Sequence, residues 1–116
     1  MTDSLDEHVD GREVLLAAAA DVDRARRQLD LHGDAGLATA RACLRVAVAR
    51  LRPVATRVDV RREVRRSAQR CRSTLSSHLL AAENLEAAGV GPAAVASLLR
   101  RATDAFEVEP SEHATA

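Results

Sequence analysis

One stretch of 35 residues, from Val54 to Ala88, contains neither Gly nor Pro and constrains the fold more than any other part of the sequence. As an α-helix it would be about 50 Å long, at a rise of about 1.5 Å per residue. Its apolar residues recur at heptad spacing from Val64 to Leu85. The sequence therefore predicts a long helix over residues 54–88, against which the other segments pack.

Three shorter segments show apolar residues at the three- and four-residue spacing of amphipathic helices. The first begins near Leu5 or near Gly11 and ends near Gly33, the second precedes Pro53, and the last begins at Pro92. Their predicted buried stripes are Leu15, Ala18, Val22, Ala25 and Leu29; Leu37, Ala40, Leu44, Ala47 and Leu51; and Val95, Leu98, Leu99, Ala102 and Phe106. The face of the first segment that lies opposite its stripe carries Asp21, Asp23, Arg24, Arg27 and Asp30.

Pro53 leaves two interpretations open. It either stands at the first helical position after a tight turn, or it kinks one long helix. We favour the turn, because so short a chain packs compactly only if it reverses there. The sequence thus predicts an all-α fold, an antiparallel four-helix bundle with a long third helix (about 54–88) and an Ala-rich core. Residues 1–107 would form a single domain and residues 108–116 an acidic flexible tail.

The expected core is poor in large side chains, with one Phe, no Trp and no Tyr. Ala buries little apolar area, and burial contributes only about 25 cal/mol per Å². Small domains with such cores often gain stability by self-association. We therefore expect a homodimer or the docking of another helical protein. The interface predicted on the third helix consists of Val64, Ala68, Leu75, His78, Leu79 and Leu85.

Charge is distributed in three blocks although the formal net charge is zero. Residues 41–72 hold eleven Arg and two acids, whereas the flanking segments are acidic. Two interpretations follow: the Arg segment pairs with carboxylates of this bundle or of a second copy, which zero net charge favours, or it contacts phosphates, which Arg binds bidentately. The residues predicted to contact a phosphate or an acidic partner are Arg57, Arg61, Arg62, Arg65, Arg66 and Arg70.

The segment Gly89-Val90-Gly91-Pro92, followed by Val95 and Leu98, resembles the loop of a helix-hairpin-helix motif. The resemblance covers about 15 residues and implies that backbone N–H groups at Gly89 and Gly91 bind DNA phosphate without sequence preference. Ala93 stands where that family usually has a basic residue, and Ala87 replaces a large apolar one. The alternative is a plain helix C-cap followed by a Pro at the first helical position, which explains the same residues.

Catalysis and cofactor binding find little support in the sequence. Cys43 and Cys71 are expected to be separate small apolar residues, since a turn at Pro53 would set them roughly 12 Å apart along the helix axis. No E-x-x-H pair, zinc-ligand spacing or Gly-rich phosphate loop is present. The longest apolar run, Val14 to Ala20, is far shorter than the ~20 residues that span a bilayer. An acidic N-terminus does not match a signal peptide, so we expect a cytoplasmic protein.

These observations predict a non-enzymatic helical-bundle interaction module, without metal or cofactor, that self-associates or docks a partner helix. The alternative is a small nucleic-acid-associated protein, which would contact phosphates through the Arg-rich helix and the loop at residues 89–92. The absence of Trp and Tyr disfavours stacking on single-stranded bases.

Overall fold

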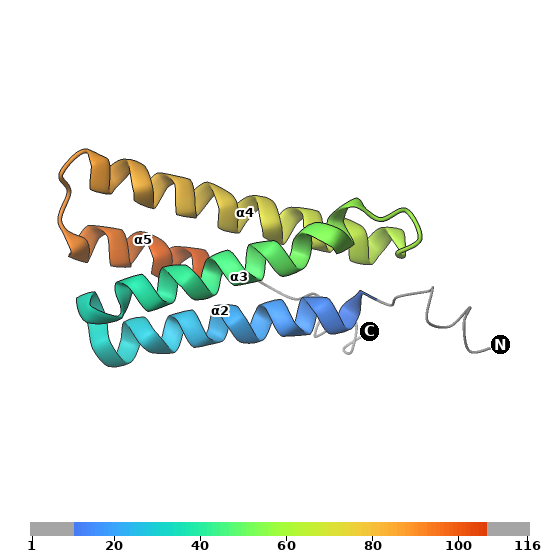
Figure 1. The fold of residues 1–116 in the computed structure, drawn as a ribbon, viewed down its shortest axis with the longest axis horizontal. Helices are drawn as coiled ribbons and strands as arrows, with labels where there is room; N and C mark the ends of the chain where they lie inside the picture. The colour runs from blue at the N-terminus through green and yellow to red at the C-terminus, as the bar shows by residue number, and fades with distance from the viewer. Residues whose placement is uncertain (1–10, 107–116) are drawn as a thin grey trace.

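The computed structural model describes residues 11–106, and every regular element in that range is helical. The elements are α2 (Arg12–His32), the 3-10 turn η1 (Gly33–Gly36), α3 (Leu37–Thr56), α4 (Arg62–Ala87) and α5 (Pro92–Ala105). Consecutive α-helices reverse direction and lie side by side (Figure 1). The alternative start near Leu5 and the acidic tail expected at 108–116 lie outside the described residues.

The prediction of a compact all-α fold is confirmed for the described residues. The antiparallel four-helix bundle is not confirmed, because α2, η1 and α3 follow one another without a non-helical residue. The four pieces therefore join into three continuous helical segments, residues 12–56, 62–87 and 92–105.

The predicted boundary between the second and third helices is wrong. Residues 54–56 belong to α3, which continues through Pro53, and α4 begins only at Arg62. Pro53 removes a single backbone hydrogen bond close to the end of the helix. Val54 and Ala55 are buried in the core, so the last turn of α3 is held by packing. The chain reverses over residues 57–61, and neither interpretation of Pro53 describes it.

The predicted apolar stripes of α2 and α3 are confirmed, since all ten of their residues are buried. The core is rich in Ala as predicted, and its fully buried Ala residues are Ala18, Ala25, Ala40, Ala47, Ala68, Ala82 and Ala102. Small side chains at these positions allow the helix backbones to approach closely. The same property makes the packing intolerant of added volume.

Gly36 marks the closest of these approaches, where η1 meets α2. A Cβ at this position would lie 2.3 Å from the backbone oxygen of Gln28, closer than any real contact. Only a residue without a side chain fits here, because the obstacle is backbone and cannot rotate away.

Replacing Gly36 with Ala should therefore destabilise the fold by about 2 kcal/mol, the usual cost of overpacking. For a chain of this size that corresponds to a fall in Tm of roughly 10 °C, measured by circular dichroism. Gly91→Ala is the matched control, because a Cβ at Gly91 meets nothing within 4 Å. Equal melting of the two variants would contradict the assigned contact.

Asp21 is the second feature that the sequence pattern misplaced. It was expected on the polar face of its helix, but only 2% of it is exposed. Arg50 of α3 donates a hydrogen bond from Nε to Asp21 Oδ2 at 2.5 Å, and Arg24 lies 3.4 Å from Oδ1. A buried carboxylate needs such partners, because removing it from water is costly. Asp21 and Arg50 thus form a polar clamp between α2 and α3.

Removing the cation alone should be more harmful than removing both partners. Arg50→Ala leaves the Asp21 carboxylate buried without its shortest hydrogen bond and should destabilise the protein by about 2–3 kcal/mol in urea unfolding. Arg27→Ala is the control, because its partner Asp23 is exposed and such surface pairs contribute about 0.2–1 kcal/mol. The double variant Asp21→Ala/Arg50→Ala should be more stable than Arg50→Ala alone. If the losses in free energy of unfolding of the two single variants simply add in the double variant, Asp21 and Arg50 do not form the clamp.

Candidate anion-binding surface

The turn between α3 and α4 is held by side chains that the sequence assigned to ligand binding. Arg57 Nε donates to Asp59 Oδ1 at 2.8 Å, and a second hydrogen bond joins Arg57 Nη2 to Asp59 Oδ2. This hydrogen-bonded pairing raises the pKa of Arg57. Val60 is buried and anchors the turn to the core.

Backbone carbonyls at the turn are satisfied from α4. Arg65 Nη1 donates to the carbonyl oxygens of Arg57 at 3.3 Å and of Val60 at 3.2 Å. Gln69 Nε2 donates to the carbonyl of Ala55 at 2.9 Å, one of the last carbonyls of α3 that lack a partner within the helix. Arg57 and Arg65 are therefore engaged in the turn itself.

The remaining cations of the predicted set project outward at the start of α4. Arg61, Arg62 and Arg66 are exposed, and none of them forms an ion pair within residues 11–106. Arg62 and Arg66 are four residues apart and so share one face of the helix. Arg70 is also exposed but already has an interaction partner. We call Arg61, Arg62 and Arg66 the Arg surface.

The field of the helix adds to the charge of the Arg surface. Arg61 is the N-cap of α4 and makes no side-chain capping hydrogen bond. The positive end of the helix dipole therefore lies among these guanidinium groups. Residues 61–66 hold four Arg and a single acid, Glu63. The arrangement provides several hydrogen-bond donors to an anion and excess positive charge at one end of the molecule.

Eight Arg residues outside the Arg surface pair with carboxylates within residues 11–106, but only four of these, Arg41, Arg45, Arg50 and Arg57, belong to the segment 41–72 for which the first interpretation predicted such pairing. On α3, Arg41 lies 2.7 Å from Glu86, Arg45 lies 3.0 Å from Glu83, and Arg50 reaches Asp21. The hydrogen bond from Arg41 lowers the pKa of the Glu86 carboxyl. Further ion pairs join Arg24 to Asp21, Arg26 to Asp104, Arg27 to Asp23, and Arg100 to Asp30. Three Arg residues without such pairs are spread over α3, α4 and α5: Arg52, Arg72 and Arg101.

The predicted partner interface on α4 lies mostly inside the chain's own core. Val64, Ala68, Leu75 and Leu79 are buried against the other helices. His78 is half-buried with its Nδ1 2.8 Å from the Thr74 carbonyl oxygen, and Leu85 packs against the edge of the core. These side chains therefore stabilise the fold, and a partner would have to be recognised elsewhere.

The loop that resembles a helix-hairpin-helix has the geometry of a helix C-cap. Gly89 has φ +84°, its N–H donates to Glu86 O at 3.0 Å, and Val90 N–H donates to Leu85 O at 3.0 Å. This is the pair of bonds found in a Schellman motif, and Pro92 then opens α5. The N–H groups of Gly89 and Val90 are thus used internally. The loop and the Arg surface also lie at opposite ends of α4 (Figure 1).

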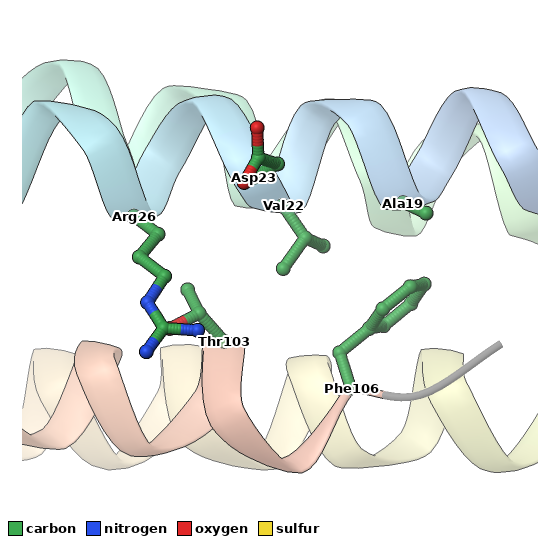
Figure 2. Close-up of a pocket in the computed structure, with 6 residues that line it drawn as sticks. All are labelled: Ala19, Val22, Asp23, Arg26, Thr103 and Phe106. Atoms are coloured by element: carbon green, nitrogen blue, oxygen red, sulfur yellow. The ribbon is translucent and has the colours of Figure 1, made fainter.

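A concave feature lies between α2 and α5. This open pocket of about 320 Å³ is lined by Ala19, Val22, Asp23, Arg26, Thr103 and Phe106, and Figure 2 shows Val22 and Phe106 bordering the space between the two helices. Its polar groups already have partners: Arg26 pairs with Asp104 at 3.2 Å, and Thr103 donates to Arg100 O at 2.7 Å. The pocket therefore offers mainly apolar contact.

The described residues contain neither a cluster of metal ligands nor a helix of membrane-spanning character. Among residues 11–106, no three His, Cys, Asp or Glu side chains lie together as a metal site would require. Neither Cys43 nor Cys71 takes part in a disulfide within that range. None of the helices described is long and apolar enough to cross a membrane. Comparison with protein families, with curated proteins and with solved structures found no match to this chain.

The division between structural and exposed Arg residues can be tested by melting. Arg65→Ala removes donors from two turn carbonyls and should lower the free energy of unfolding by about 1 kcal/mol. Arg62→Ala and Arg66→Ala remove exposed side chains without hydrogen bonds and should change it by less than about 0.5 kcal/mol. If all three variants melt alike, Arg65 belongs to the Arg surface and not to the turn.

Proposed function

We propose that this protein is a non-enzymatic interaction module that docks an acidic segment of a partner protein on the Arg surface. The observation that carries the proposal is the exposure of Arg61, Arg62 and Arg66 without an ion pair in the described residues, in a chain whose other Arg residues are mostly paired. Exposed guanidinium groups bind carboxylates through charge-assisted, often bidentate hydrogen bonds. Charge complementarity of this kind also steers encounter with an acidic partner.

Two further observations support a docking role over a purely structural one. The apolar side chains of α4 that were expected to meet a partner are occupied by the core. The α3–α4 turn is cross-linked by hydrogen bonds from Arg57, Arg65 and Gln69, so the Arg surface stands on a fixed base. A preorganised surface loses less entropy when a partner binds.

The finer expectations from the sequence are kept as part of this proposal. We propose that the helical pieces act as an antiparallel four-helix bundle and that the protein is cytoplasmic, because cysteines outside disulfides, such as Cys43 and Cys71, persist in that compartment. Self-association into a homodimer is compatible with an acidic partner segment, because the chain itself holds as many acids as Arg residues.

Nucleic acid is the second candidate partner, since the same three Arg residues and the uncapped start of α4 would also suit phosphates. Glu63 within the surface disfavours a polyphosphate backbone, and the loop at residues 89–92 lies at the far end of α4 and adds no donors there. We therefore rank an acidic protein segment first.

The test measures fluorescence anisotropy with a labelled poly-glutamate peptide and a labelled duplex DNA. A triple variant should weaken poly-glutamate binding by about tenfold or more, since each contact contributes roughly 0.5–1 kcal/mol. This variant replaces Arg61, Arg62 and Arg66 with Gln. The control changes Arg26, Arg27 and Arg101 to Gln, which removes the same charge from exposed sites elsewhere and should have an effect of less than about threefold.

The outcomes separate the two candidates. Duplex DNA held by three phosphate contacts should lose roughly 40-fold in affinity between 50 and 200 mM salt. Binding of DNA with that slope, through the same residues and without poly-glutamate binding, would replace the first candidate with the second. If neither probe binds, or if the control variant weakens binding as much as the triple variant, both are wrong.

A further inference from the structure

The described chain begins beside the Arg surface. Gly11 is buried at the start of α2 with φ +79°, and a Cβ there would lie 2.8 Å from Val64 Cγ1 and 3.2 Å from Val60 Cγ1. Val60 immediately precedes Arg61, and Val64 lies in the first turn of α4, on the buried face opposite to the exposed Arg62 and Arg66. Figure 1 shows the start of α2 and the α3–α4 turn at the same end of the molecule. The segment that precedes Gly11 is therefore tethered at the end of α4 that carries the Arg surface.

The ten residues before Gly11 carry charge opposite to that surface. They contain Asp3, Asp6, Glu7 and Asp10, and neither Arg nor Lys. Asp6 and Glu7 stand five and four residues from Gly11, respectively, and each residue spans at most about 3.3–3.6 Å. Their carboxylates thus have a reach of up to roughly 17 Å from a point that already touches the first turn of α4. Both the length and the charge of this segment fit the Arg surface.

We propose that residues 1–10 bind the Arg surface of their own chain and compete there with the acidic partner. The competition rests on the proposed function, whereas the contact within the chain does not. A short tether supplies its ligand at an effective concentration on the order of millimolar, so even a weak contact occupies the surface for much of the time. The partner then binds with an affinity reduced by the fraction of chains in which the surface is occupied. The segment acts as a built-in competitor that only a strongly acidic partner displaces.

The contact within the chain is tested without any partner. The printed sequence has no Lys, so a paramagnetic tag can be placed selectively on the α-amino group of Met1. At low salt the tag should broaden the backbone amide signals of residues 61–66. The broadening should fall at 0.5 M salt, which shortens the Debye length to a few ångströms. It should fall equally in a variant with Asp3→Asn, Asp6→Asn and Glu7→Gln; Asp10 is left unchanged because it adjoins Gly11.

The other end of the chain supplies a matched control. The control variant replaces three acids that follow Phe106 with Gln: Glu107, Glu109 and Glu112. It removes the same number of charges as the first variant, and Phe106 itself lies at the pocket between α2 and α5. That variant should keep the broadening. In anisotropy, the variant of Asp3, Asp6 and Glu7 should bind poly-glutamate about three- to tenfold more tightly than the unchanged chain, and the control variant should bind within about twofold of it.

Each outcome decides between the hypotheses. Equal broadening in all variants and at both salt concentrations would overturn the contact within the chain, regardless of whether poly-glutamate binds. Broadening that responds as expected, in a protein that does not bind poly-glutamate with or without its acidic segment, would keep the contact and overturn the proposed function. Equal gains in affinity for the two neutralised variants would assign the effect to net charge, and the competition would be wrong.

Discussion

The fold depends on how closely helices can approach when their contact residues are small. Seven Ala residues in the described core have no exposed surface, and Gly36 lets a backbone atom of α2 occupy the space of a side chain. Dispersion and apolar burial per residue are modest at such contacts, so many of them must form together. The polar clamp of Asp21 and Arg50 adds a directional interaction between the same two helices. Close approach thus fixes the relative positions of α2 and α3, and the rest of the structure is built on that pair.

Charge matching explains why the Arg surface lies where it does. The Arg residues of α3 face carboxylates on α2 and on the second half of α4, and three of them form ion pairs there. The first turn of α4 contains a single acid, Glu63, and Asp59 in the preceding turn is paired with Arg57. Excess positive charge is therefore confined to the end of the molecule where α3 meets α4.

The sequence predicted what depends on periodicity and missed what depends on where the chain turns. The apolar stripes of α2 and α3 follow from a 3.6-residue period, which the printed sequence shows directly. The end of α3 does not, because burial of Val54 and Ala55 keeps the helix intact beyond Pro53. Asp21 follows the polar pattern of its neighbours, and only the position of Arg50 on the next helix explains its burial. In the candidate site, Arg61, Arg62 and Arg66 could be named in advance, but Arg57 and Arg65 could not be separated from them without knowing which carbonyls the turn leaves open.

The unbroken helical path from α2 through η1 to α3 has a mechanical consequence. Because that corner has no non-helical residue and Gly36 lies against the backbone of α2, the helices α2 and α3 form one rigid unit. Between residues 12 and 105 the helical path is interrupted only at 57–61 and 88–91, and hydrogen bonds from Arg57, Arg65 and Gln69 hold the first of these segments, so the Arg surface is fixed to the same rigid unit as α2 and α3.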